Sequence, residues 1–124
     1  MAEKVEIISP IEMRLEIIAE RKKYFENVDH YLQIIKREVT EIFPDAKVYL
    51  FGSVIRGDYK IYSDVDVMIV SDRAPENISE QSKIKVHLLR EIGDLFAPFE
   101  FHITTTEVFE NWYKKFIKDE IKME

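Results

Sequence analysis

The sequence predicts an α+β domain in which a small mixed three-stranded sheet has helices packed against one face. Apolar residues recur at helical spacing in three stretches, and three short β-prone segments lie between or beside them. The 124 residues contain no internal repeat and no linker rich in Gly or Ser. We therefore expect a single domain over residues 1–124.

The first helical stretch covers about residues 10–43. It opens with Ser9–Glu12 (Ser-Pro-Ile-Glu), the sequence of a capping box with proline at the first helical position. Because the stretch is longer than a typical globular helix, we expect a break near residues 27–29. Pro44 ends it, since the residue before a proline avoids helical backbone angles.

Three strands and two further helices follow. The strands are expected at Lys47–Phe51, Asp64–Val70 and Phe99–Ile103. A helix is expected over Ser79–Phe96, with Ser79 as N-cap and Gly93 near its end. A last helix is expected after the Thr-Thr-Thr-Glu sequence at 104–107, with an apolar face of Val108, Trp112, Phe116 and Ile117.

Composition excludes several classes of protein. With 46% hydrophobic residues the chain can form a packed core, and without cysteine it has neither disulfides nor thiolate metal sites. A net charge of −6 disfavours broad nucleic-acid binding, which rests on many Lys and Arg contacts to phosphates. No apolar run approaches the ~20 residues of a membrane span, and the N-terminus does not resemble a signal peptide. We expect a cytoplasmic protein that binds no membrane.

Asp64 and Asp66 form the first chemical pattern. Alternate residues of a strand point to one face, so these carboxylates can converge on hard divalent cations, which prefer oxygen ligands. Val65, Val67 and Ile69 would then point to the buried face. Taken alone, an Asp-x-Asp sequence is more often a half-exposed strand with solvated acids.

Gly52 and Ser53 form the second pattern. A glycine at the end of a strand lets a phosphate approach the backbone closely, and free amides at the start of a following turn point toward an anion. The Ser53 hydroxyl can add a hydrogen bond. On its own, Gly-Ser is an ordinary tight turn.

The two patterns together are far more specific. The chain reads Gly52-Ser53-Val54-Ile55-Arg56-Gly57, then five residues, then Ser63-Asp64-Val65-Asp66. This arrangement resembles the DNA polymerase β-like nucleotidyltransferase superfamily, and the small size resembles its minimal nucleotidyltransferase branch. The resemblance spans roughly residues 48–103. It implies a palm-like fold with three catalytic, metal-binding carboxylates, two on the second strand and one on a later strand.

Asp64 and Asp66 match the first two of these carboxylates. For the third we choose Glu100, because its aromatic neighbours on the strand would point into the core while Glu100 faces the same surface as Asp66. Many relatives have Asp at this place. Asp94 is the alternative, although it lies on a predicted helix.

The resemblance also implies a set of nucleotide-binding residues. Val54 stands where relatives often carry Arg, whereas Arg56 matches a commonly basic position and would either contact the triphosphate or pair with Asp58. His102 shares a face with Glu100; we expect a hydrogen-bonded structural histidine, with a place beside the site as the alternative. The implied nucleotide-binding residues are Gly52, Ser53, Arg56, Gly57 and Ser63.

The function that the resemblance implies is transfer of a nucleoside monophosphate, with AMP expected, from a nucleoside triphosphate to an acceptor hydroxyl. Pyrophosphate is released, and two Mg²⁺ ions, or Mn²⁺, assist. One alternative is an antitoxin-type module that binds a small helical HEPN-type partner, and another is a catalytically inactive nucleotide-binding domain. A second copy of the chain is a further possible partner, which would give a homodimer. Aromatic side chains that could either form a binding surface or complete the core are Tyr24, Phe25, Phe109, Trp112, Tyr113 and Phe116.

Overall fold

The computed structural model describes residues 9–60, 62–116 and 120–123, with side chains described except at 112, 116 and 120–123. The elements in chain order are α1 (Pro10–Glu26), α2 (Val28–Ile42), β1 (Lys47–Phe51), α3 (Ser53–Arg56), β2 (Val65–Val70), α4 (Ile78–Ile92), β3 (Phe99–Thr104), α5 (Thr106–Val108), the π-helical turn η1 (Phe109–Tyr113), α6 (Lys114–Phe116) and β4 (Glu120–Met123).

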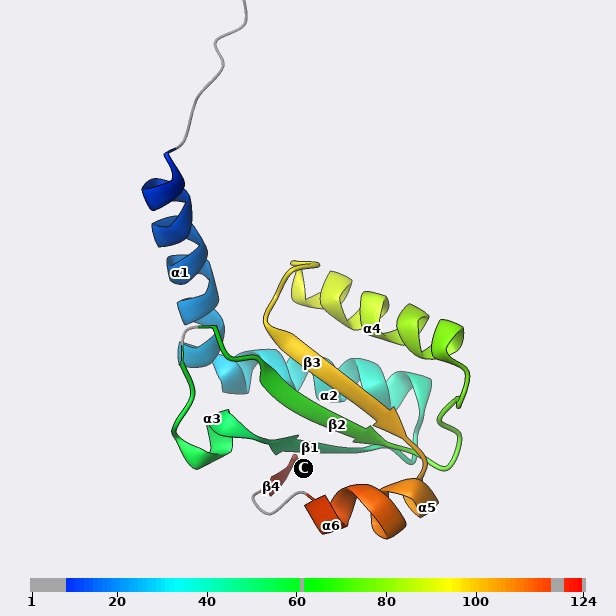
Figure 1. The fold of residues 1–124 in the computed structure, drawn as a ribbon. Helices are drawn as coiled ribbons and strands as arrows, with labels where there is room; N and C mark the ends of the chain where they lie inside the picture. Colours follow the sequence, from blue (N-terminus) through cyan, green and yellow to red (C-terminus); the bar gives the residue numbers. More distant parts are fainter. Residues whose placement is uncertain (1–8, 61, 117–119, 124) are drawn as a thin grey trace, which may run out of the picture.

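The sheet has the strand order β3-β2-β1-β4 (Figure 1). β1 is antiparallel to both β2 and β4, whereas β2 and β3 are parallel. The α+β class and the mixed sheet are therefore confirmed, and the three predicted strands are present. The prediction of only three strands is wrong, because β4 adds a fourth at the edge of β1. Its four residues give too short a pattern to be recognised without knowing the strand that they pair with.

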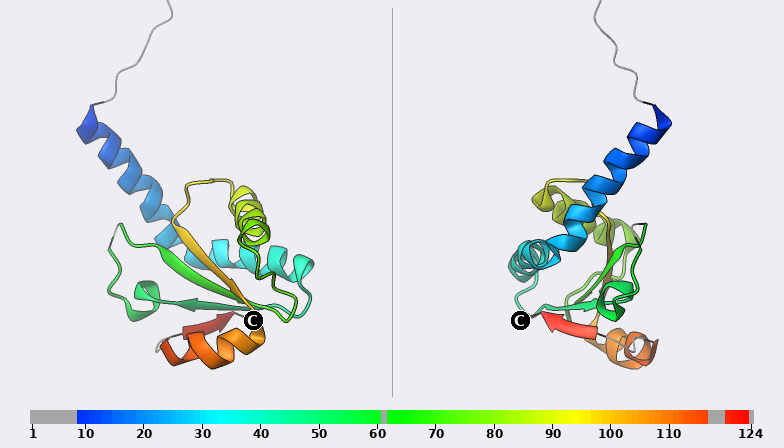
Figure 2. Two further views of the ribbon diagram at one scale, coloured as in Figure 1. Left: turned by 45° about the vertical axis from the view of Figure 1, so that its right-hand side comes forward. Right: turned by 90° about the vertical axis from the view of Figure 1, so that its left-hand side faces the viewer.

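One face of the sheet carries the main core. Alternate side chains from β1, β2 and β3 pack against α2, α4 and the end of α1, and Leu32, Ile35 and Leu88 are completely buried among them. Met68, Val70 and Phe109 form a smaller cluster on the other face. Figure 2 shows α2 and α4 on one side of the sheet and the α5–α6 segment on the other. The last helical segment thus departs from the expectation that all helices cover one face.

The N-terminal stretch divides as expected, with α1 ending at Glu26 and α2 beginning at Val28. The capping box is formed: the Glu12 amide donates to the Ser9 hydroxyl at 3.1 Å, and the Ser9 amide donates to the Glu12 carboxylate at 3.4 Å. Only Tyr24 and Phe25 of α1 are buried, and the amino-terminal turns of the helix project from the body (Figure 1). None of the helices in the described ranges has both the length and the apolar character that a membrane span requires.

The later helices differ from the predicted bounds. Asn77, not Ser79, is the N-cap of α4, and its side chain accepts hydrogen bonds from the Ser79 and Glu80 amides. The helix stops at Ile92 because Gly93 takes a left-handed conformation with φ of 97°, which ends helices. The last predicted helix begins with Thr105 as its cap but divides into α5, η1 and α6. Ile117 lies outside the described residues.

Candidate functional site

Three polar side chains meet on one face of the neighbouring strands β2 and β3. Asp66 and Glu100 are direct partners in the parallel pairing, and His102 follows Glu100 on the same face. A ligand atom from each of Asp66, Glu100 and His102 lies within 4.8 Å of the other two. The alternation of strand residues causes this convergence, because Val65, Val67, Phe99 and Phe101 point into the core on the opposite face.

His102 is not the hydrogen-bonded structural histidine that the sequence suggested. Its Nε2 atom lies 3.7 Å from Asp66 Oδ1 and 3.8 Å from Glu100 Oε1, beyond hydrogen-bond length. Within the described part of the chain this buried nitrogen has no hydrogen-bond partner. The imidazole ring lies beside the Phe51 ring, with centroids 5.2 Å apart. His102 is therefore part of the acidic site.

Gly52 makes a close approach to this site. Its φ of 83° and ψ of −153° belong to a region that is essentially restricted to glycine. A Cβ atom at this position would overlap the Asp66 carboxylate. The glycine was predicted as the place where a phosphate nears the backbone, and the structure shows that it also makes room for Asp66.

The turn after Gly52 is the short helix α3. The Arg56 amide donates to the Gly52 carbonyl at 3.2 Å, and Gly57 closes the turn with a left-handed φ of 78°. Ser53 is the first residue of α3, where backbone amides have no partner inside the helix. Of the two alternatives for Arg56, the structure shows the pair with Asp58, at 3.3 Å between Nε and Oδ2.

Ser63 and Asp64 lie just before β2, and their contacts come from the preceding loop and from α1. The Ser63 hydroxyl accepts from the Lys60 amide at 2.9 Å and closes the loop. Arg21, on α1, donates to the Ser63 carbonyl at 2.6 Å and lies 3.3 Å from Asp64 Oδ1. The structure does not bring Asp64 into the group of Asp66, Glu100 and His102.

Asp94, the alternative third carboxylate, has a different role. Its carboxylate accepts from the Tyr24 hydroxyl at 2.8 Å and from the Phe96 amide at 2.8 Å. Burial, and then the hydrogen bond to Asp94, raise the pKa of the Tyr24 hydroxyl well above its ordinary value. Asp94 connects α1 to the loop before β3 and does not belong to the acidic group.

Arg21 escaped the sequence analysis, and the role of His102 was assigned differently. Arg21 is separated from Asp64 by 43 positions, so no local pattern could have indicated the contact. His102 was noticed, because it shares the face of Glu100, but its missing hydrogen-bond partner is visible only in the folded chain.

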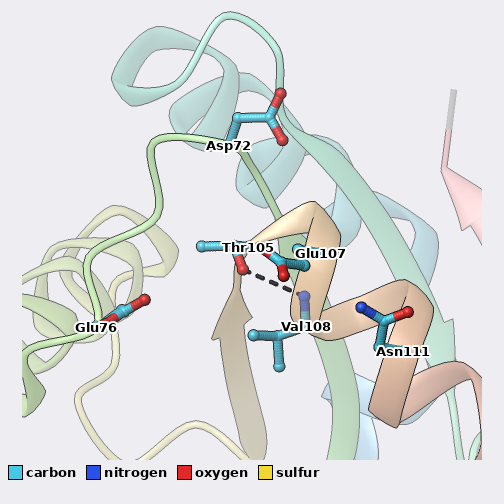
Figure 3. A pocket seen from close by; sticks show the side chains of 6 residues that line it. All are labelled: Asp72, Glu76, Thr105, Glu107, Val108 and Asn111. Atoms are coloured by element: carbon cyan, nitrogen blue, oxygen red, sulfur yellow. Dashed lines mark hydrogen bonds between the residues drawn. The ribbon is translucent and has the colours of Figure 1, made fainter.

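The donor set fits a divalent cation. Two carboxylates offer the oxygen ligands that Mg²⁺ and Mn²⁺ take, and a buried imidazole nitrogen without a partner offers one more. A separate pocket lies away from this group. The pocket in Figure 3 lies beyond the carboxyl ends of β2 and β3, at the far end of the sheet, and there the Thr105 hydroxyl accepts from the Val108 amide as a helix cap. It is lined by Asp72, Glu76, Thr105, Glu107, Val108 and Asn111.

The aromatic side chains divide between core and surface. Tyr24, Phe25 and Phe109 are buried, whereas Tyr113 is partly exposed. The side chains of Trp112 and Phe116 are outside the described set. The three buried aromatic residues therefore complete the two cores and do not form a binding surface.

Comparison with known proteins finds relatives named as nucleotidyltransferases or adenylyltransferases. A crystal structure of a provisionally identified nucleotidyltransferase superimposes with a TM-score of 0.52 and 36% identity, covering 75% of this chain and 97% of that one. A protein of Methanocaldococcus jannaschii, provisionally named a protein adenylyltransferase, is 42% identical over 53 residues. A protein of Haemophilus influenzae, also provisionally named a protein adenylyltransferase, is 42% identical over 41 residues.

The two curated matches are partial. The first covers 41% of this chain and 54% of the archaeal protein, and the second covers 33% of this chain and 36% of the bacterial one. The family model described as "Nucleotidyltransferase domain" is broader and matches residues 32–123, from the first turns of α2 through β4. Helix α1, with Arg21, precedes that match. Since the family model covers most of the sequence, this chain belongs to the nucleotidyltransferase domain family.

Proposed function

We propose that this chain transfers a nucleoside monophosphate, with AMP favoured, from a nucleoside triphosphate to an acceptor hydroxyl. The observation that carries the proposal is the placement of the Asp66–Glu100 pair beside the Gly52–Ser53 turn. Carboxylates for a cation and backbone amides for phosphates are the two parts that phosphoryl transfer needs. AMP is favoured because both curated relatives are named as protein adenylyltransferases.

In the proposed reaction the acceptor oxygen attacks the α-phosphorus of the triphosphate. A new P–O bond forms, the bond from the α-phosphorus to the bridging oxygen breaks, and pyrophosphate leaves. The acceptor proton passes to a carboxylate of the site or to water. Positioning and charge neutralisation account for most of such catalysis, because little covalent chemistry is required of the protein.

Each residue of the site has a proposed role in that step. Asp66 and Glu100 would hold Mg²⁺ or Mn²⁺, which supplies neutralising charge to the phosphate oxygens. Asp64 would join them only after its carboxylate turns away from Arg21. The Gly52 and Ser53 backbone would bind the β- and γ-phosphates. The remaining residues proposed to shape the nucleotide site are Arg56, Gly57 and Ser63.

A second proposed role is binding of a partner protein, such as a small helical HEPN-type protein or a second copy of this chain. The observation that favours it is α1, which lies before the family match and projects from the body. Its Ile11, Leu15 and Ile17 side chains are more than half exposed, and apolar side chains gathered on one helix are typical of interaction surfaces. Such binding is compatible with catalysis.

The proposed activity is tested with ATP labelled at either the α- or the γ-phosphate, incubated with the chain, a divalent cation and candidate protein acceptors. We expect label to reach the acceptor only from the α-position, with release of pyrophosphate. Asp66→Asn should reduce transfer by at least about 100-fold. The variant loses one carboxylate ligand of the cation, and with it electrostatic stabilisation of the transition state. Asp72→Asn is the matched control, since this exposed acid follows the other end of β2. Transfer from the γ-position, or full activity of Asp66→Asn, would refute the assignment.

A further inference from the structure

We infer that His102 is a direct ligand of the cation held by Asp66 and Glu100, so that the site prefers Mn²⁺ and similar transition metals over Mg²⁺. The inference deepens the proposed function, because it concerns the metal of the same site. It departs from the all-carboxylate ligand set that the sequence suggested and predicts a different selectivity.

The distances support a shared cation. Ligands bound at about 2.1 Å lie roughly 3.0 Å apart when adjacent and roughly 4.2 Å apart when opposite, in an octahedral site. His102 Nε2 lies 3.7 Å from Asp66 Oδ1 and 3.8 Å from Glu100 Oε1, between these two limits. One cation can therefore bridge His102 to each carboxylate after side-chain rotation.

The state of the imidazole nitrogen supports the same conclusion. Nearly all buried polar atoms in proteins have a hydrogen-bond partner, and those that lack one call for an explanation such as an ion. His102 Nε2 is buried and has no partner among the described residues, although two carboxylates face it. A cation between them would satisfy the nitrogen and neutralise both acids at once.

Packing of the neighbouring residues also fixes the position of the His102 imidazole beside the two carboxylates. On β3 it lies between Phe101 and Ile103, which are both buried in the main core, and it pairs with the buried Met68 of β2. The Phe51 ring packs beside the imidazole. These contacts restrict the ring before any ion binds, so the ligand set is largely preorganised.

The nature of the donors determines the selectivity. Mg²⁺ requires nearly regular octahedral oxygen ligands and loses its water reluctantly, whereas imidazole nitrogen suits first-row transition metals. A second group with the same kinds of donor, Glu38, His87 and Glu91, connects α2 and α4. There, however, His87 Nε2 lies 3.0 Å from Glu38 Oε2 and is already partnered.

The test uses Mn²⁺ as the probe and electron paramagnetic resonance as the readout, without any nucleotide. Pulsed spectra of the wild-type chain should show ¹⁴N coupling to bound Mn²⁺. His102→Gln should remove the coupling and weaken Mn²⁺ binding by about 10–100-fold, while Mg²⁺ affinity changes far less. His87→Gln is the matched control, since it removes the other candidate nitrogen and should leave the coupling intact.

Each outcome decides the inference. Bound Mn²⁺ without ¹⁴N coupling in the wild-type chain overturns it, and this result needs no variant to fold. Coupling that persists in His102→Gln or disappears in His87→Gln also overturns it, as does the absence of Mn²⁺ binding. Coupling without any nucleotide transfer would leave the inference standing and refute the proposed function, whereas transfer without coupling would do the reverse.

Discussion

Replacing Gly52 with alanine tests the closest contact of the site. The backbone at Gly52 has φ of 83° and ψ of −153°, and holding alanine there costs about 1–3 kcal/mol. The new Cβ would overlap the Asp66 carboxylate, and overpacking of this kind adds about 1–3 kcal/mol more. We expect the free energy of unfolding to fall by about 2–6 kcal/mol, and divalent-cation affinity to fall because Asp66 is displaced.

Gly57→Ala is the matched control for this change. Gly57 also has a positive φ, 78°, but a Cβ there would meet nothing within 4 Å. Its cost is backbone strain alone, about 1–2 kcal/mol, with no effect on the Asp66 carboxylate. Urea denaturation and Mn²⁺ titration of both variants provide the comparison. Equal losses of stability and unchanged Mn²⁺ affinity in Gly52→Ala would show that the close approach does not exist.

Three further changes test other parts of the fold. Leu32→Ala, at a fully buried position, should lower the free energy of unfolding by about 2–5 kcal/mol, as measured by urea denaturation. Hydrogen bonds from the Ser71 hydroxyl and the Asp72 amide hold the pKa of Asp45 below its ordinary value of 3.8. Its stabilising contribution should be present above that value and lost as the pH falls through the folded-state pKa, so Asp45→Asn should flatten the acid limb of a plot of stability against pH from about 5 to 2. Arg21→Ala should lower the free energy of unfolding by about 1 kcal/mol through the lost bond to the Ser63 carbonyl, and an unchanged melting temperature would contradict this.

Local signals explain what could be predicted of the fold. The Ser9–Glu12 capping box and strand β1 each depend on residues that are consecutive in the chain, and the structure confirms both. Helix α4 shows the limit of that method. Its helical spacing continues through Leu95, but Gly93 adopts a left-handed conformation, and the exposed Leu95 and Phe96 follow in a loop. Strand β4 depends on pairing with β1, and sequence periodicity does not indicate such a pairing.

The candidate site also has features that the local sequence predicts and features that it does not. Asp66 and Glu100 could be placed on one face from strand alternation alone, and the register of β2 with β3 makes them direct partners. The orientation of Asp64 could not be foreseen, because it depends on Arg21, 43 residues earlier in the chain. The missing partner of His102 depends on how three side chains pack around it.

The face that carries the site is itself divided along the strands. Toward the carboxyl end of β2, Met68 and Val70 are covered by Phe109, whose ring stacks on Tyr49 with centroids 4.8 Å apart. Toward the amino end of β2 the same face carries Asp66, which is partly exposed. The apolar half fixes the strands against the helical C-terminal segment, whereas the polar half stays open to solvent and to a substrate. Because β2 supplies both halves through alternate residues, any change that shifts its register would expose the core and dismantle the site together.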